Sequence, residues 1–424
     1  MSSHSSVGIT LRCSQMALCR AWLNMCWFNM FMLSTLILLS AVVAVAQGPP
    51  ATPSVATIRD AAAALAAGDL KRAESELQAI LHAEPTDVHA LNLLAIVRVE
   101  QKREAEAEVL FKQAIAIQPN FAGAHAGLGL LYAQAGKDDL AIPELQQSAR
   151  LDPSRKDVQA VLISIWRSQA HDAAEHNELE KALALLIGAR KLNPADADVQ
   201  YEFGMVALRM SLFPDAIDAF DQTLKLRVDD AAALYGLGRA KISVSSFDDA
   251  KQAFERYVQL RPADASGHYA LGFSVQALQR PADARAEYEK SIALQPLQTE
   301  SYFQLGLIEL EAGNADGAAK QFNHVLDRAP QHAGALTGMG RVRFQEKQYE
   351  AAAVSFERAI ASSPGLREAH YYLGLTDSRL GRKEDSEKEL QIASRIEREE
   401  VEKHQAPLKI IDPDQLPATE PRPR

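Results

Sequence analysis

The chain has 424 residues, of which 47% are apolar, 24% charged and 6% aromatic, a composition typical of globular proteins. Its 45 basic and 55 acidic side chains give a formal charge of −10, and no run rich in Lys and Arg occurs, which argues against binding to nucleic acid. The three cysteines are Cys13, Cys19 and Cys26. A chain that begins after them has no disulfide, thiolate metal site or cysteine nucleophile.

The N-terminal segment is predicted to direct export. No charged side chain occurs between Arg20 and Arg59, and the apolar run of residues 27–46 ends in Ala-Val-Ala before Gln47. A basic start, an apolar stretch and a small-x-small site describe a signal peptide over residues 1–46, cleaved after Ala46. The alternative is an uncleaved anchor formed by residues 27–46, which are just long enough to span a bilayer. In either case we expect a periplasmic or extracellular protein, and translation could start at Met1 or Met16.

Prolines mark an internal repeat of 34 residues. Pro85, Pro119 and Pro153 are 34 residues apart, as are Pro262, Pro296, Pro330 and Pro364. Between the two sets the period lengthens once, to 41 residues, and it then passes through Pro194 and Val228. Ten units follow, at residues 54–87, 88–121, 122–155, 156–196, 197–230, 231–264, 265–298, 299–332, 333–366 and 367–400. A linker (47–53) precedes them, and a proline-rich tail (401–424), predicted to be disordered, follows.

Each unit is predicted to form two helices that pack closely through small residues. Glycine recurs at the eighth place and alanine at the twentieth, whereas large apolar residues fill the seventh and twenty-fourth places. Small residues let two helices approach, and the large ones fill the seam between them. Gly68, Gly136, Gly313 and Gly381 suit a left-handed turn after the first helix. The proline column ends the second helix, because the residue before proline avoids the α region.

These columns resemble the tetratricopeptide repeat, whose pattern of Leu-Gly, Ala, large aromatic and Pro they match in phase. The resemblance implies an all-α fold: a right-handed α-α superhelix of helix-turn-helix repeats whose first helices line a concave groove. It also implies protein partners and no intrinsic catalysis. We expect no cofactor.

The resemblance and helical spacing together place the second, fifth, ninth and twelfth residues of each first helix on the groove. The fifth place then forms an aromatic ladder, interrupted by Thr337, that consists of Tyr201, Tyr235, Tyr269, Phe303 and Tyr371. The ninth place adds the isolated cations Arg239 and Arg341 but no asparagine, so the carboxylate clamp and asparagine ladder known in the family are unsupported. Aromatic side chains of this kind can anchor peptides, or they can pack only against the neighbouring helix.

The fourth unit is seven residues longer than the others, and we expect the extra residues to lengthen both of its helices by about one turn. His171, Asp172, Glu175, His176 and Glu178 lie in this region. Their spacing matches no zinc motif, so we interpret them as a solvated surface and predict no metal site. No phosphate-binding loop or nucleophile elbow occurs in the sequence.

The sequence therefore favours a non-enzymatic, exported scaffold that binds extended or helical peptide segments, for example in an envelope or secretion complex. A role in polysaccharide export or assembly, or as the partner subunit of a separately encoded enzyme, is the alternative, since aromatic side chains also stack on sugars. The membrane is expected to be contacted only through an uncleaved N-terminal segment.

Overall fold

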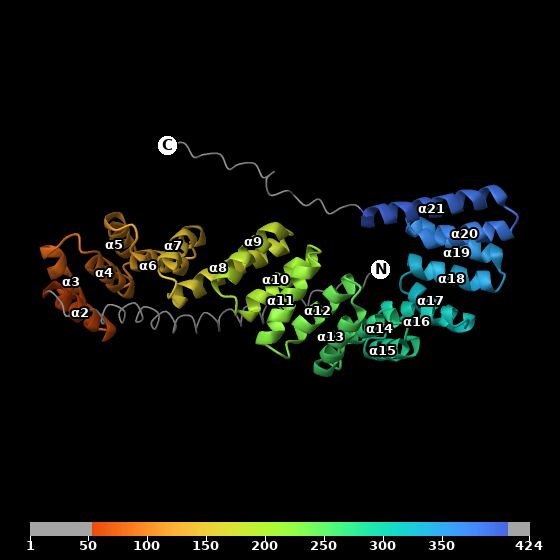
Figure 1. Cartoon of the computed structure of the whole chain (residues 1–424), viewed down its shortest axis with the longest axis horizontal. Coiled ribbons are helices and arrows are strands. Elements are labelled where there is room, and N and C mark those ends of the chain that lie inside the picture. Colours follow the sequence, from red (N-terminus) through yellow and green to blue (C-terminus); the bar gives the residue numbers. More distant parts are fainter. Residues whose placement is uncertain (1–52, 406–424) are drawn as a thin grey trace, which may run out of the picture. The chain divides into compact units, whose positions relative to one another are not determined.

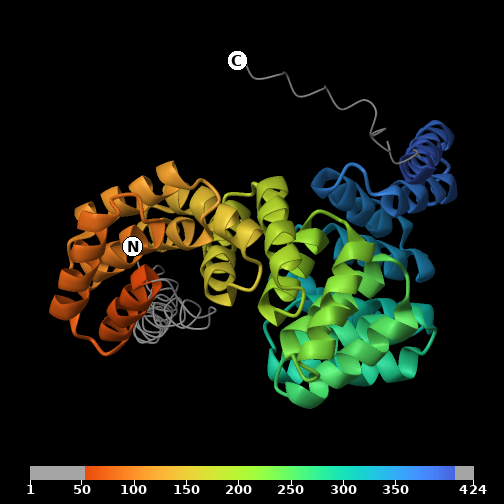
Figure 2. The ribbon, with the colours of Figure 1, turned by 60° about the vertical axis from the view of Figure 1, so that its left-hand side comes forward.

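The computed structural model describes residues 53–405, and every regular element in this range is an α-helix. The predicted leader and most of the predicted linker lie outside the described residues, as do residues 406–424. Helices follow one another in antiparallel pairs along the chain (Figures 1 and 2). The predicted all-α class, with tandem helix-turn-helix repeats, is thereby confirmed for the described residues.

The first helices of the ten pairs begin at or within one residue of the predicted repeat starts. They are α2 (Pro53–Ala66), α4 (Val88–Glu100), α6 (Ala122–Gln134), α8 (Lys156–Glu175), α10 (Ala197–Arg209), α12 (Ala231–Ser243), α14 (Ala265–Ala277), α16 (Glu300–Glu311), α18 (Ala333–Gln345) and α20 (Arg367–Arg379). Asp87, Asp230 and Asp264 each accept a hydrogen bond from a backbone N–H in the first turn of the helix that follows. These carboxylates satisfy donors that have no partner within the helix.

The second helices each follow after a short turn. They are α3 (Leu70–Ala83), α5 (Glu104–Ile117), α7 (Asp138–Leu151), α9 (Leu179–Leu192), α11 (Phe213–Leu226), α13 (Phe247–Leu260), α15 (Pro281–Leu294), α17 (Ala315–Leu326), α19 (Tyr349–Ser362) and α21 (Lys383–Gln405). The tail was predicted to begin at Val401, but α21 continues through Gln405.

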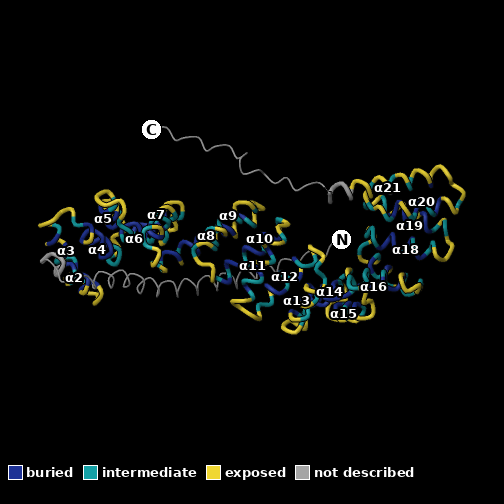
Figure 3. The backbone as a smooth tube through the Cα atoms, in the orientation of Figure 1, coloured by how far each residue is buried: buried dark blue, intermediate teal, exposed yellow. Residues whose placement is uncertain are grey.

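The core is the seam within and between pairs, and its buried residues follow the helices while exposed residues mark the turns (Figure 3). The alanines of the twentieth place, from Ala73 to Ala352, are fully buried. Glycine is required at the eighth place: a Cβ on Gly238 would lie 2.5 Å from the Phe254 ring, and one on Gly340 would lie 2.4 Å from Phe356. The small and large columns therefore pack as the sequence predicts.

Contacts between helices divide the chain into two units, Met1–Val206 and Ala207–Arg424. In the first, residues from α2 to α10 form one continuous apolar cluster that extends from Ile58 to Val199. In the second, smaller clusters centre on buried aromatic rings, including Tyr288, Phe322 and Phe356. Consecutive helices pack against each other within each unit.

The extra residues of the fourth repeat correct one expectation. All seven lie in α8, which has 20 residues, while α9 keeps the usual 14. This arrangement leaves the buried positions of the second helix in register, since Ala182, Leu186 and Ala189 all pack into the seam. A single turn added to α9 would have rotated that face away from its neighbours.

Candidate binding face of the first helices

The fifth-place aromatic residues of the second unit are half-buried and contact rings of the second helices. Tyr235 lies 5.6 Å from Phe254 and 5.1 Å from Tyr257, measured between ring centroids. Tyr269 lies 5.9 Å from Tyr288. Burial raises the pKa of both Tyr235 and Tyr269, so both hydroxyls are neutral donors at ordinary pH. Each ring therefore packs against its own repeat while part of it stays accessible.

The remaining predicted positions of this row differ in exposure. Phe303 is half-buried, 6.2 Å from Phe322 and 5.0 Å from His332. Tyr371 is the most open, with 43% of its surface exposed. Thr337, which interrupts the row, is buried and donates to the carbonyl of Ala333. Tyr201 is half-buried and belongs to the first unit.

The two predicted cations occupy different environments. Arg341 donates to the carboxylate of Glu368 over 2.9 Å, and its guanidinium lies 5.2 Å from the centre of the Tyr372 ring. Arg239 is exposed on α12, and its guanidinium forms no ion pair or hydrogen bond with the described residues. Of these two cations, Arg239 is therefore the one that is available to a ligand.

A polar clamp between successive repeats was not anticipated from the sequence. In three repeats the fourth residue of the first helix is a buried histidine whose Nδ1 faces a glutamate and whose Nε2 faces the carbonyl of the preceding proline. In His268 these distances are 2.7 Å to Glu287 and 3.0 Å to Pro262. His125 and His370 repeat the geometry. In the fourth and fifth repeats glutamine makes the same bond to the proline carbonyl, as Gln159 and Gln200.

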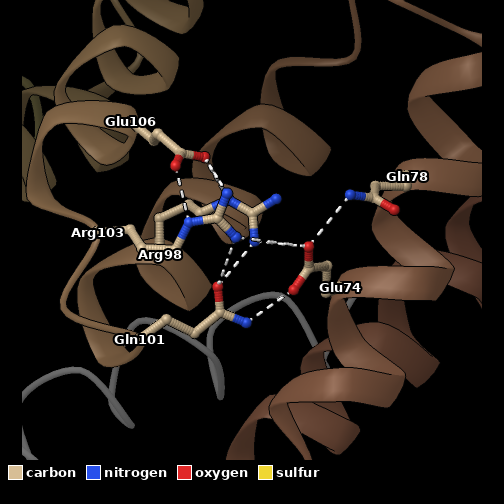
Figure 4. A network of polar contacts seen from close by, with 6 residues as sticks. All are labelled: Glu74, Gln78, Arg98, Gln101, Arg103 and Glu106. Carbon is tan, nitrogen blue, oxygen red and sulfur yellow. Dashed lines mark hydrogen bonds and ion pairs between the residues drawn. The ribbon is translucent and has the colours of Figure 1, made fainter.

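A second unanticipated feature is a set of polar contacts at the eleventh place, where the family pattern has an aromatic residue. Figure 4 shows one of them: the buried Arg98 of α4 bonds to Glu74 of the preceding repeat over 2.7 Å and pairs with Glu106 over 3.2 Å. Gln101 donates to Glu74 over 2.7 Å, and the hydrogen bonds from Gln101 and Arg98 lower the pKa of Glu74.

The same pairing recurs between later repeats. Glu309 at the eleventh place of α16 accepts from Arg285 of the preceding repeat, and Tyr132 donates to Glu108 over 2.9 Å. These contacts couple a second helix to the next first helix. They hold neighbouring repeats together and leave the first-helix face to other residues.

The lengthened helix α8 offers no catalytic or metal-binding arrangement. His171 and Glu175 are exposed and 3.3 Å apart. Across residues 53–405, no cluster of three or more His, Cys, Asp or Glu side chains could hold a metal ion. No helix in that same range combines the length and apolar character needed to span a bilayer.

Two curated proteins resemble short stretches of the chain. One is the protein O-mannosyl-transferase TMTC3 of Homo sapiens, 33% identical over 81 residues, which are 19% of this chain and 9% of that protein. Another is the Superkiller complex protein 3 of Mus musculus, 40% identical over 67 residues, which are 16% of this chain and 4% of that protein. The chain thus matches less than a tenth of the length of either relative.

Solved structures of repeat proteins are also similar. YrrB, described as a TPR protein with an unusual peptide-binding site, is 26% identical, with a TM-score of 0.37 over 43% of this chain and 95% of that one. MamA is 24% identical, with a TM-score of 0.37 over 39% and 96% of the two chains. The Cut9–Hcn1 structure is 13% identical, with a TM-score of 0.44 over 81% and 94%.

Family models settle the relationship. One tetratricopeptide repeat model matches residues 60–120, 201–265 and 269–333, and a second matches residues 98–163, so that together they cover more than half of the chain. The matched stretches include helix pairs of both units. This chain belongs to the tetratricopeptide repeat family.

Proposed function

We propose that this protein is an exported, non-enzymatic scaffold that binds segments of partner proteins on its first-helix face, meaning the second, fifth, ninth and twelfth places of the first helices. Membership of the tetratricopeptide repeat family supports an interaction role, because stacked repeats present long continuous surfaces. The observation that carries the proposal is the fifth-place row, whose rings are anchored by their own repeats yet remain partly accessible. Rigid, partly exposed rings bind partners at low entropic cost.

Export is the second part of the proposal, and it rests on the charge-free apolar run and the Ala-Val-Ala site before Gln47. An exported scaffold of this kind suits the assembly of envelope or secretion complexes. N-terminal sequencing of protein recovered from the periplasm or medium should begin at Gln47. Recovery only from the cytosol, with residues 1–46 intact, would refute export.

Site-specific photocrosslinking in intact cells tests the binding face. A photoreactive phenylalanine analogue replaces Phe273, which is half-buried at the ninth place of α14. The matched control places the same analogue at Val354, which is 53% exposed on the second helix α19. We expect defined protein adducts from position 273 and none of the same adducts from position 354. Identical adducts from both positions, at unchanged melting temperature, would contradict the proposed face.

The exposed Tyr371 ring favours a second candidate, a glycan ligand in polysaccharide export, because aromatic faces also stack on sugars. A glycan array distinguishes the two. Selective retention of a polysaccharide that Tyr371→Ala abolishes, together with the absence of protein adducts at position 273, would replace the protein-scaffold proposal.

A further inference from the structure

Helix α12 presents two unused hydrogen-bond donors on one side. Tyr235 and Arg239 are four residues apart, a spacing that places both side chains on the same face of a helix. Neither the guanidinium of Arg239 nor the hydroxyl of Tyr235 makes a hydrogen bond within the part of the chain that the structure describes. The two groups are close enough for the Arg239 charge to lower the pKa of Tyr235 against the larger, raising effect of burial.

Other basic residues on first helices of this unit are already engaged. Lys241 pairs with Asp249 over 2.8 Å, and Arg341 with Glu368 over 2.9 Å. Arg343 donates to the hydroxyl of Ser355 over 2.5 Å and to the carbonyl of Ala351 over 3.2 Å. Arg239 differs from these residues because it is both exposed and uncompensated.

The acidic group that influences Tyr235 is also engaged elsewhere. Asp264 accepts from the hydroxyl of Tyr257 through one carboxylate oxygen and from the backbone N–H of Ser266 over 2.8 Å through the other. On the next first helix, the residue at the place of Arg239 is the half-buried Phe273. The free cation therefore lies beside aromatic surface without an anion of its own.

We propose that Tyr235 and Arg239 bind the side-chain carboxylate of an Asp or Glu in the partner segment, and that this acidic residue is flanked by large apolar residues. This inference rests on the proposed function and specifies its ligand. A guanidinium binds a carboxylate through two parallel charge-assisted bonds, and the tyrosine hydroxyl supplies a third donor. The apolar neighbours of the acidic residue pack against Tyr269 and Phe273.

A side-chain carboxylate fits better than the terminal carboxylate of a peptide. The ninth places of the two first helices that follow α12 hold Phe273 and Leu307, so no second cation is supplied there to hold a chain end. The apolar places continue past Arg239, so a bound segment extends beyond its acidic residue.

The test uses the protein purified from its own cells and a displayed library of random 12-residue peptides. We expect enriched peptides to share an Asp or Glu next to large apolar residues. In a synthetic peptide from that set, replacing the acidic residue with its amide should weaken binding by about tenfold or more. With Arg239→Gln the acidic peptide and its amide should bind equally. Tyr235→Phe, which keeps the ring packing, should weaken the acidic peptide severalfold.

Arg341→Gln is the matched control, because it removes a cation from the same place two or more helices away, where Glu368 already pairs with it. It should leave the preference for the acidic peptide intact. Enriched peptides without a shared acidic residue, or a preference that survives Arg239→Gln, would overturn this inference and leave the proposed function standing. Binding lost on amidating only the peptide terminus would overturn it in favour of a terminal carboxylate. If no peptide is enriched, both the inference and the peptide-binding function fail.

Discussion

One residue in each turn between a first and a second helix adopts a left-handed conformation, and glycine supplies it in only four of the ten repeats. Gly68, Gly136, Gly313 and Gly381 have φ between 67° and 77°. The equivalent residues of the other six repeats have φ between 57° and 63° and are Lys102, Asn177, Ser211, Ser245, Gln279 and Lys347. The sequence shows the four glycines clearly, but only the repeat register identifies the six strained positions.

Replacing a strained turn residue with glycine should stabilise the protein. We expect Gln279→Gly and Lys347→Gly each to raise the unfolding free energy by about 1 kcal/mol, because a left-handed backbone costs an L-residue roughly that amount. Chemical denaturation measures the change. The reverse substitution, Gly136→Ala, is the control: no atom lies within 4 Å of its added Cβ, so any loss of stability reports the backbone alone. Equal stability of all three variants would show that the turns carry no strain.

The clamp on the proline carbonyl also admits a comparison that the chain itself provides. His268→Gln should keep the bond to the carbonyl of Pro262, as Gln159 and Gln200 do in their repeats, whereas His268→Leu leaves that carbonyl unpaired. We expect the leucine variant to be less stable than the glutamine variant by about 1 kcal/mol. Thermal melts of both variants measure this difference, and a leucine variant as stable as the glutamine variant would argue that the clamp contributes nothing.

At the scale of elements, the repeat period and the small and large columns suffice to predict the helix pairs and the seam, because each column has one steric role in every copy. The period cannot assign the seven extra residues of the fourth repeat, since either helix could have taken them. Charged residues at the eleventh place, such as Arg98 and Glu309, lack a local signal because their partners lie in the preceding repeat. For the same reason spacing placed Arg239 and Arg341 on one face but could not show that only Arg341 is paired.

The contact between α15 and α16 predicts a response to acid. The hydrogen bond from Arg285 lowers the pKa of Glu309 below its ordinary range, against the raising effect of burial. A carboxyl whose folded pKa is depressed stabilises the protein above its unfolded pKa of about 4.3, and this stability is lost as the pH falls through the folded value. Glu309→Gln should therefore be less stable than the wild type at pH 7, and the difference should shrink towards pH 3.

Denaturation curves at several pH values measure this convergence. Glu311→Gln, at an exposed position of the same helix, is the control and should track the wild type throughout. A deficit for Glu309→Gln that stays constant from pH 7 to pH 3 would show that its carboxylate does not stabilise this contact.

At the scale of the whole molecule, each helix packs chiefly against its neighbours in the sequence, so stability is local. Stacked repeats behave approximately as a one-dimensional array in which a repeat stabilises only adjacent ones. The family fold thus gives a long surface whose parts can be tuned separately: aliphatic seams dominate the first unit, and aromatic rings recur in the second. A ligand-binding residue such as Arg239 can then vary without disturbing distant repeats.

This locality predicts that a core defect stays within one unit. Phe254→Ala removes a fully buried ring and should cost about 3–5 kcal/mol. Hydrogen exchange followed by mass spectrometry should show faster exchange in α12 to α15 and unchanged exchange in α2 to α7, because the lost contacts are all near neighbours. Phe111→Ala, an equally buried ring of the first unit, should give the mirror result, with faster exchange in α4 to α7 and none in α16 to α21. Uniformly faster exchange along the chain in either variant would mean that the repeats unfold as one cooperative block, and the separate tuning of the binding face would then be untenable.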